Sequence, residues 1–424
     1  MSELNKLISD LGGQSKIEQA LQSNFSWILK SFKTNKLKGS SGWKTIHGKW
    51  SAPYPETTGY LIPSLLNGSK YVQGEELSKL AIKQLDFFKE IQNKDGSFPR
   101  SINDRGPLVF DTAQILLGLL AIAPTLTKNS EKTLTFIKKT WNWLRGQLNK
   151  QGKFIDYNYI ENYNPSYYAR IAWPLAQGDQ VFKSKISQRC KALINRIADS
   201  QNENYSFADC ALFPKHAPLT HNISYTLRGM WEYALLANDN KLKKQVTKSL
   251  DFISELITNE GVLGGTYNNS WEADKSFICA TGNGQLALLY LLVYEKSGLT
   301  KYLKPVSILL KPLLRSQSSF GLNNGAIPSS IPIWGKYQRF RYTNWTQKFF
   351  VDTLMKLLEL NENSSIVDSS NKEASGFYEV YRLLSQENYE VGKSVRIFID
   401  SFKKENSNIL IRVFTFFVND AIGA

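Results

Sequence analysis

The sequence of 424 residues predicts an all-α protein, an (α/α)6 toroid of six helical hairpins. The main observation is a repeated turn, usually a glycine close to an aromatic residue, followed by an apolar helix with a polar and aromatic opening. The turns lie at Gly42, Gly96, Gly152, Asn204-Tyr205, Gly261 and Gly321. Their spacings of 54, 56, 52, 57 and 60 residues are typical of a repeat architecture. Each period has room for two helices of about 15–20 residues with their connections, so six periods predict a ring of six hairpins.

The outer helix of each hairpin is predicted from apolar residues at helical spacing. The first runs from about residue 16 to residue 32, with Ile17, Leu21, Phe25 and Ile28 on one face. The other outer helices are expected near residues 76–92, 131–148, 181–200, 240–258 and 300–316.

The inner helices are predicted to be more apolar, because they pack on both sides. The stretches 115–120 and 286–292 show this composition. The openings of the inner helices are polar, and they lie at residues 55–60, 110–114, 165–170, 220–228, 279–285 and 342–348. Inner helices of a toroid run parallel to one another, so we expect these openings to converge on one mouth.

The composition changes after residue 360. Residues 1–360 are predicted to form the toroid, residues 361–375 a polar linker, and residues 376–424 a small C-terminal segment. Within that segment, two runs that alternate apolar and polar side chains predict a short β-hairpin; they are residues 395–399 and 409–414.

The sequence is typical of a cytoplasmic protein. It has no run of about 18 apolar residues, so no membrane span is expected. The N-terminal residues lack an apolar run of signal-peptide length. Cys190, Cys210 and Cys279 fit reduced thiols, and they lack the spacing of metal ligands. We therefore expect neither a metal ion nor another cofactor.

The net charge of +15 favours an acidic partner. Lysines spread over the predicted outer helices form a solvated surface, and they also offer a positive field that steers a polyanion towards the mouth. No helix-turn-helix, zinc-finger or RNA-binding signature is present, so nucleic acid is not expected as a partner. An acidic glycan fits the charge together with the aromatic content of 12%.

The fourth opening carries the first set of candidate catalytic residues. His221, Tyr225 and Arg228 stand at positions i, i+4 and i+7, so they share one helical face. They offer a base or acid, a second proton carrier and an anion clamp. The alternative is that His221 and Arg228 only hydrogen-bond to neighbouring hairpins.

Glu56 and Asp111, in the first and second openings, are the second set of candidates. As helix caps or first-turn acids they would need no catalytic role. Neighbouring inner helices lie about 8–10 Å apart. If both side chains face the mouth, this spacing suits the two carboxylates of an inverting glycosidase.

Polar and aromatic side chains at the openings and in two loops are candidates for substrate binding. They are Tyr60, Gln114, Tyr167, Tyr168, Arg170, Asn222, Trp271, Asn283, Gln285, Trp334, Tyr337, Asn344, Trp345 and Lys348. The proline-rich loop 325–337 is predicted to roof the mouth, and the loop 267–271 to stack on a sugar ring. The residues expected to line one pocket are Glu56, Asp111, Tyr168, His221, Asn283 and Trp345.

Several segments resemble a known family. They are PETTGYLIPSLL (55–66), VFDTAQILLGLL (109–120), THNISYTLRGMWE (220–232), CATGNGQLALLYL (279–291), and GAIPSSIPIWGKY with YTNWTQKFFVDTL (325–354). Over roughly residues 40–360 the chain resembles a bacterial family of α/α-toroid proteins associated with polysaccharide biosynthesis. It is more distantly similar to uronate lyases, unsaturated glucuronyl hydrolases and glucuronyl epimerases. The resemblance implies a carbohydrate-active protein that contacts polysaccharide-assembly proteins.

Three functions remain open at this point. The first is an enzyme that abstracts the C5 proton of a uronate, as a lyase or a C5-epimerase, with Asn222 or Asn283 helping Arg228 to neutralise the carboxylate. The second is an inverting glycoside hydrolase that uses Glu56 and Asp111. The third is a glycan-binding or assembly factor without catalysis.

Overall fold

The computed structural model describes residues 2–72, 75–126 and 131–364. The chain divides after Leu360 into two units, and the first of them holds the ring of helices. The predicted linker beyond residue 364 and the predicted β-hairpin lie outside the described residues.

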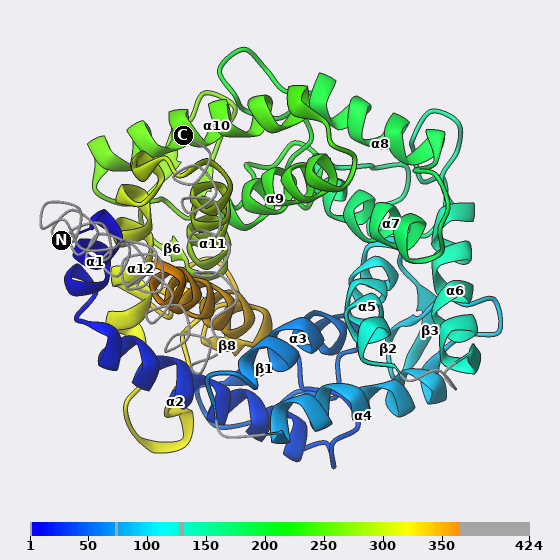
Figure 1. Cartoon of the computed structure of the whole chain (residues 1–424), viewed down its shortest axis with the longest axis horizontal. Helices are drawn as coiled ribbons and strands as arrows, with labels where there is room; N and C mark the ends of the chain where they lie inside the picture. Colours follow the sequence, from blue (N-terminus) through cyan, green and yellow to red (C-terminus); the bar gives the residue numbers. More distant parts are fainter. Residues whose placement is uncertain (1, 73–74, 127–130, 365–424) are drawn as a thin grey trace, which may run out of the picture. The chain divides into compact units, whose positions relative to one another are not determined.

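Two concentric layers of helices form the ring (Figure 1). The inner layer consists of α3 (Pro55–Gly68), α5 (Val109–Ile122), α7 (Ala169–Val181), α9 (Thr220–Leu236), α11 (Ala280–Ser297) and a last inner helix over residues 344–364. The outer layer consists of α2 (Gln14–Lys33), α4 (Glu76–Ile91), α6 (Glu131–Gly146), α8 (Gln188–Asp199), α10 (Asn240–Glu260) and α12 (Lys304–Ser316). The smaller helices are α1 (Glu3–Asp10), η1 (Ala123–Thr125), η2 (Ser166–Tyr168), η3 (Thr300–Tyr302) and η4 (Gly321–Asn323). The prediction of an all-α (α/α)6 toroid is confirmed.

The fourth outer helix begins later than the sequence predicts. Val181 ends the inner helix α7, and α8 starts at Gln188 rather than near residue 181. The reason is local: Lys183 adopts a φ of 53°, which breaks the helix, and the Ser187 side chain caps α8 by accepting from the Cys190 N–H.

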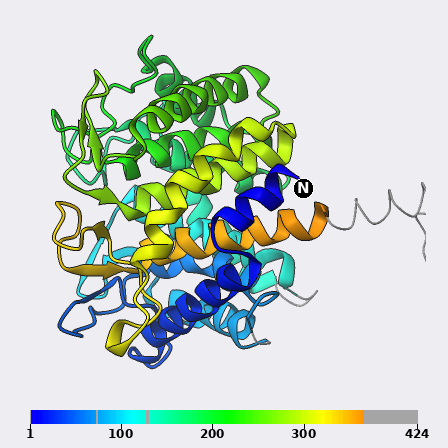
Figure 2. The ribbon, with the colours of Figure 1, turned by 90° about the vertical axis from the view of Figure 1, so that its left-hand side faces the viewer.

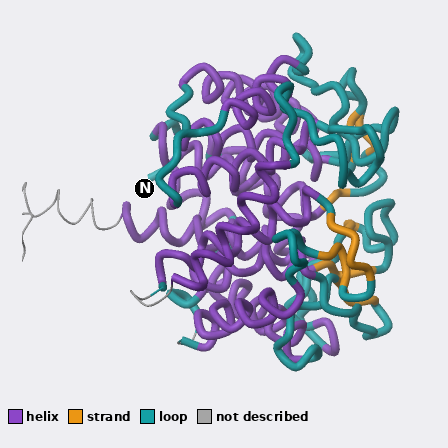
Figure 3. The backbone as a smooth tube through the Cα atoms, turned by 90° about the vertical axis from the view of Figure 1, so that its right-hand side faces the viewer, coloured by secondary structure: helices purple, strands orange, loops and turns teal. Residues whose placement is uncertain are grey.

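Strands and long loops gather at one end of the ring, which we call the loop end (Figures 2 and 3). The connections from outer to inner helices lie there, whereas the return connections are short. The two-stranded ladders are β1 (Trp43–Thr45) with β8 (Arg341–Thr343), β2 (Pro99–Ser101) with β3 (Asp104–Pro107), β4 (Thr266–Tyr267) with β5 (Ala273–Asp274), and β6 (Ile278–Cys279) with β7 (Ser330–Ile331).

The repeated turns keep a left-handed backbone in most hairpins. Positive φ angles occur at Gly96 (102°), Gly152 (70°), Tyr205 (66°), Gly261 (70°) and Gly321 (66°). Tyr205 adopts this conformation without a glycine, which explains why the fourth turn fits the period despite its sequence.

The ring is closed by contacts between the first and last hairpins. Trp43 in β1 pairs with Thr343 in β8, and the Asn24 side chain of α2 donates to the Gln347 Oε1 atom at 2.8 Å. Among the described helices, none has both the length and the apolar character needed to cross a bilayer.

Candidate active site

The first turns of the inner helices meet at the loop end, where side chains from every inner helix and one loop lie together. We call this group the mouth cluster, and its members are Glu56, Tyr60, Asp111, Arg170, His221, Tyr225, Gln285, Tyr337 and Phe349. The parallel course of the inner helices therefore brings together residues that are far apart in the sequence.

A pair of tyrosines spans the centre of the cluster. Tyr60 of α3 and Tyr225 of α9 hydrogen-bond to each other through their hydroxyls. Their rings stack with centroids 6.4 Å apart and an interplanar angle of 23°. Burial raises the pKa of both phenols, so both carry their protons at neutral pH.

Arg170 of α7 lies against this tyrosine pair. Its guanidinium is 5.1 Å from the ring centroid of Tyr225 and 5.7 Å from that of Tyr60. Its Nε atom donates to the Gln114 Oε1 atom at 3.2 Å. Arg170 is 1% exposed, and no carboxylate of the described residues forms an ion pair with it. The cluster therefore contains a buried cation whose contacts are aromatic rings and a neutral amide.

His221 lies beside Tyr225, with ring centroids 4.2 Å apart. Burial, together with the charge of Arg170, lowers the pKa of His221 to about 3, so the imidazole is neutral at pH 7. The Gln285 side-chain amide lies 2.7 Å from the Nδ1 atom, with its nitrogen facing the ring. Rotation of that amide by half a turn would place Oε1 there instead, and would move the imidazole proton to Nδ1.

Two carboxylates from adjacent helices complete the cluster. Burial raises the pKa of Asp111 to about 7, against the opposing charge of Arg100. Burial and the charge of Asp111 raise the pKa of Glu56 well above its usual value. Within the described residues, the buried Oδ2 atom of Asp111 has no hydrogen-bond partner. Burial therefore makes both carboxyls harder to ionise than free ones, and the pKa of Asp111 lies near neutral pH.

Part of the loop 325–337 covers the cluster. The Tyr337 ring centroid is 5.7 Å from that of His221, and the Tyr337 hydroxyl accepts a hydrogen bond of 2.6 Å from the Trp345 indole. Trp334 in the same loop is 62% exposed. The roof is thus formed by Tyr337 and Trp345.

The remaining exposure shows which side of the cluster is accessible. Glu56, Asp111 and His221 keep 8%, 6% and 9% of their surface exposed. Tyr60 and Arg170 keep 1% each. The carboxylates and the imidazole therefore border the opening, and the arginine lies beneath them.

A second layer of charges lies deeper in the ring and corrects one prediction. Arg228 forms an ion pair of 2.6 Å with Glu232 and stacks on Trp173. Because Glu232 matches its charge, Arg228 does not stand free as the anion clamp that the sequence suggested, whereas Arg170 of the mouth cluster has no ion pair with any described residue. Lys348 is likewise paired with Asp352 in the same layer.

Several other candidates lie away from the mouth cluster. Asn283 donates to the Leu309 carbonyl of the outer helix α12 at 3.2 Å, so it faces outwards. Asn344 donates to the Ser41 carbonyl at 2.5 Å and ties the last inner helix to the first turn. The Trp271 indole donates to the Asn204 carbonyl at 2.7 Å, in a loop packed on α10 rather than over the mouth.

The predicted common pocket is therefore only partly matched. Tyr167 packs on Phe110 at the edge of the cluster, with centroids 5.4 Å apart. Tyr168 packs behind it against Phe154, and its hydroxyl has no hydrogen-bond partner in the described chain. Asn222 is buried, and its Oδ1 atom is also without a partner there.

Sequence reasoning missed two aromatic residues of this region. Tyr54 directly precedes α3, and the charge of Asp111 followed by burial raises its pKa well above the usual value. Phe349 contacts Tyr60, Tyr225 and His221 from the last inner helix. Tyr54 directly precedes Pro55, the first residue of an inner helix, and this position in the sequence could have predicted that Tyr54 lies at the mouth.

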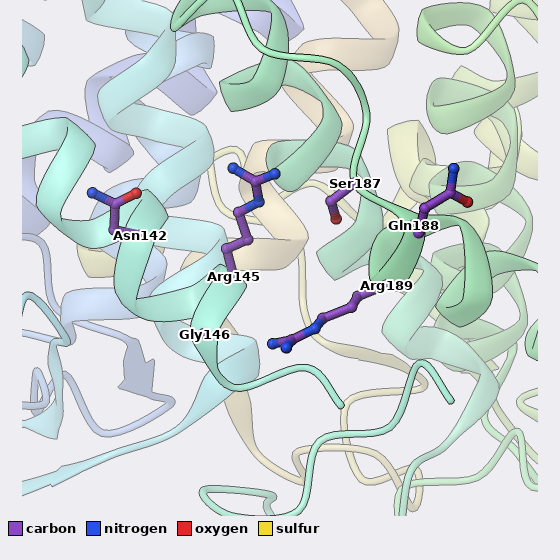
Figure 4. A pocket seen from close by; sticks show the side chains of 6 residues that line it. All are labelled: Asn142, Arg145, Gly146, Ser187, Gln188 and Arg189. Carbon is purple, nitrogen blue, oxygen red and sulfur yellow. The ribbon is translucent and has the colours of Figure 1, made fainter. Parts of the chain in front are cut away.

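A cavity of about 480 Å³ lies elsewhere, between α6 and α8 on the outside of the ring. Arg145 and Arg189 border it with Asn142, Gly146, Ser187 and Gln188 (Figure 4).

The described residues contain no group of three His, Cys, Asp or Glu side chains placed to hold a metal ion. Burial raises the pKa of all three cysteine thiols.

Comparison with known proteins identifies relatives of this fold. Residues 63–277 match the family described as the ulvan lyase N-terminal domain. No curated protein sequence matches the chain.

Solved structures of low sequence identity share the architecture. An unsaturated glucuronyl hydrolase from Bacillus sp. GL1, responsible for the degradation of glycosaminoglycan, has a TM-score of 0.64 at 10% identity, over 80% of this chain and 96% of that one. A D-mannose isomerase has a TM-score of 0.64 at 10% identity, over 81% and 97%. The cellobiose 2-epimerase from Bacillus thermoamylovorans has a TM-score of 0.60 at 12% identity, over 74% and 92%.

Proposed function

Because the chain belongs to the ulvan lyase N-terminal domain family, we propose that it is a carbohydrate-active enzyme that acts on an acidic, uronate-containing glycan. The observation that carries the proposal is Arg170, a buried cation without a carboxylate partner in the described part of the chain, with its guanidinium over the rings of Tyr60 and Tyr225. A buried charge needs compensation, and a substrate carboxylate or the negative charge formed during reaction supplies it.

The arrangement of the ring adds to this positive field. The N-termini of all six inner helices lie at the loop end, and each contributes partial positive charge. In the deeper layer Arg228 is matched by Glu232 and Lys348 by Asp352. Within the described residues, the charge of Arg170 is thus unmatched by an ion pair, and it favours an anion at the mouth.

In the proposed reaction, His221 takes the proton from C5 of the uronate. Its low pKa, set by burial and the charge of Arg170, keeps the imidazole unprotonated at pH 7, and the carboxylate of a bound uronate, by matching that charge, would raise the basicity that the step needs. The role requires Gln285 to present Oε1 to the Nδ1 proton, which leaves the Nε2 lone pair free. The negative charge that spreads onto the substrate carboxylate is stabilised by Arg170.

Tyr225 then supplies a proton. Its raised pKa keeps the phenol protonated, and Tyr60 is in place to share the charge through the hydroxyl–hydroxyl bond. In a lyase, the C5–H electron pair forms the C4=C5 double bond, the C4–O bond breaks, and Tyr225 protonates the leaving oxygen. In a C5-epimerase, no C–O bond breaks, and C5 receives a proton on its other face.

The first prediction tests this chemistry directly. Incubation with ulvan and with other uronate polymers is expected to give ultraviolet absorbance from unsaturated ends, or deuterium at C5 in heavy water. Replacement of one general acid or base typically lowers a rate by about 10²–10⁴-fold, and we expect losses of this size for His221→Ala and Tyr225→Phe.

One variant serves as a control, and a pair of variants at Gln285 tests the orientation of the imidazole. Tyr290→Phe removes a buried hydroxyl that donates to the Leu250 carbonyl on the outer side of α11, so it should keep its activity. Gln285→Glu should retain more activity than Gln285→Met, because only the former can accept from Nδ1. If no polymer of the panel gave absorbance from unsaturated ends or deuterium at C5, the proposal would be contradicted.

A second candidate, inverting hydrolysis, is favoured by the coupled carboxylates. Burial raises the pKa of both Glu56 and Asp111, and the charge of Asp111 raises that of Glu56 further, so the site favours one protonated and one ionised carboxyl, as a general acid and a general base require. This reaction would release reducing ends without unsaturation, and Glu56→Gln and Asp111→Asn would each abolish it. A binding factor without catalysis would instead retain affinity for the glycan and leave it chemically unchanged.

A cytoplasmic location and contact with polysaccharide-assembly proteins remain part of the proposal. The positive net charge of +15 suits either a soluble acidic glycan or an acidic assembly partner. Fractionation of cells and capture of cross-linked neighbours would test both.

A further inference from the structure

We propose that Tyr159, Phe213 and Arg100 form a flanking subsite, which binds the sugar next to the one that reacts. This inference rests on the proposed function, since it concerns the path of an acidic glycan out of the mouth. None of the three residues belongs to the catalytic assignment above.

Tyr159 and Phe213 are large rings that the fold leaves in water. They are 50% and 42% exposed, and their centroids lie 6.1 Å apart at an interplanar angle of 65°. They come from different hairpins, in the connections before α7 and before α9. Burying such rings in the core would be favourable, so exposed rings next to a mouth are typical of a surface that binds apolar sugar faces.

The loop that carries Tyr159 is anchored beside the carboxylates. The Val109 N–H, two residues before Asp111, donates to the Tyr157 carbonyl at 2.9 Å. The Tyr163 hydroxyl donates to the Ala211 carbonyl at 3.0 Å, which links this loop to the one that carries Phe213. Tyr159 is also within electrostatic range of Tyr54 and Tyr167 at the edge of the cluster. The ring pair is therefore held at a fixed place along the rim.

Arg100 adds the charge that an acidic sugar requires. It lies in the β2–β3 ladder of the second hairpin, where its neighbour Pro99 pairs with Pro107, two residues before the Val109 N–H that bonds to the loop of Tyr159. Its ion pair with Asp104 joins side chains that are 55% and 39% exposed. Exposed ion pairs contribute little to stability, so a sugar carboxylate or sulfate can replace Asp104 at the guanidinium. Rings and cation together specify a charged sugar.

The test compares uronate oligosaccharides of increasing length, from disaccharide to hexasaccharide. Tyr159→Ala and Phe213→Ala are expected to weaken binding of the hexasaccharide by about tenfold in calorimetry, the equivalent of one lost stacking contact, and to leave the disaccharide unaffected. Tyr159→Phe should bind like the wild type. Arg100→Gln should lose the preference for charged over neutral oligosaccharides.

Leu299→Ala is the matched control, since this residue is 51% exposed in the connection after α11, at the other end of the inner helices. Thermal unfolding verifies that each variant folds. Equal losses for short and long oligosaccharides would overturn the subsite. The subsite would also be overturned if the wild type were a dimer and Tyr159→Ala converted it to a monomer without changing its affinity for the glycan.

The two proposals fail in distinguishable ways. Turnover of a uronate polymer without any length-dependent effect of Tyr159→Ala refutes the subsite and leaves the reaction standing. Length-dependent binding without turnover by the wild type refutes the reaction and leaves the subsite standing.

Discussion

Single residues at the mouth differ in whether they hold a proton near pH 7, and burial sets this difference. It raises the pKa of Asp111 to about 7 and that of Glu56 well above its usual range. It lowers the pKa of His221 to about 3. Strongly shifted pKa values gathered at one mouth are typical of a catalytic site. The same burial has a cost in stability, because ionising a buried carboxylate opposes folding.

That cost gives a prediction for Asp111→Asn. The folded pKa of Asp111, about 7, lies above the ordinary value of 3.8. Its contribution to stability is therefore present below about pH 4 and is lost as the pH rises through 7. We expect the free energy of unfolding of the wild type to fall over this range, and the fall to be smaller in Asp111→Asn by up to about 4 kcal/mol.

Urea unfolding at pH 4, 6 and 8 measures this difference. Asp86→Asn, on the exposed face of α4, is the control and should keep the wild-type slope. Parallel slopes for the wild type and Asp111→Asn would show that the carboxylate is solvated.

Pairs of inner helices approach so closely that only glycine fits between them. A Cβ atom on Gly229 of α9 would lie 2.3 Å from the Ala169 carbonyl carbon and 2.4 Å from the Arg170 nitrogen of α7. A Cβ atom on Gly118 of α5 would lie 2.3 Å from the Gly59 carbonyl oxygen of α3. These contacts are backbone to backbone, so they cannot be relieved by rotating a side chain. They set the spacing of the helices that carry the mouth cluster.

Gly229→Ala is therefore expected to act on both stability and activity. Overpacking of this kind costs about 1–3 kcal/mol. The extra methyl group pushes against the backbone of Arg170. A displacement of the Arg170 guanidinium by about 1 Å can lower the rate by about a hundredfold. Urea unfolding and the uronate assay measure the two effects.

Gly146→Ala at the end of α6 is the matched control, because no atom lies within 4 Å of its Cβ position. It should be neutral or slightly stabilising. A fully active Gly229→Ala would mean that the position of Arg170 does not matter for the reaction.

The helices themselves were predictable because their signals are local. Glycine turns at a constant period and apolar spacing predicted the hairpins, and the ring followed from their number. The start of α8 was misplaced because Val181 and Phe182 continue an apolar pattern, although Ser187 offered a capping signal. The i, i+4 spacing of His221 and Tyr225 likewise matches the contact of their rings.

The sequence predicted less well which face of each inner helix is turned towards the mouth. α11 is apolar on all sides, so nothing in its sequence distinguishes Gln285, which faces the mouth, from Asn283, which faces α12. The pairing of Arg228 with Glu232 was visible as an i, i+4 pair. The unpaired state of Arg170 was not visible, because it depends on which side chains four other inner helices bring within reach.

The whole ring depends on contacts between segments that are far apart in the sequence. Asn24 of α2 is fully buried and donates to the Gly325 carbonyl at 2.7 Å and to the Gln347 Oε1 atom at 2.8 Å. Gln347, on the last inner helix, in turn accepts from the Ile327 N–H at 2.8 Å. One side chain thus joins the first outer helix, the roof loop and the last inner helix. In an open array of hairpins these groups would face water.

Asn24→Ala tests whether the closed ring unfolds as a unit. The substitution removes the buried hydrogen bonds to the Gly325 carbonyl and the Gln347 Oε1 atom, each of which keeps one other donor, and each lost bond costs about 0.5–1.5 kcal/mol. We expect a lower free energy of unfolding in a single transition, with faster hydrogen exchange in β1 and β8, where Trp43 pairs with Thr343. Gln22→Ala, exposed on the same helix, should change neither quantity. If Asn24→Ala instead produced two separate transitions, the hairpins would unfold as independent repeats, and ring closure would not be what holds the mouth together.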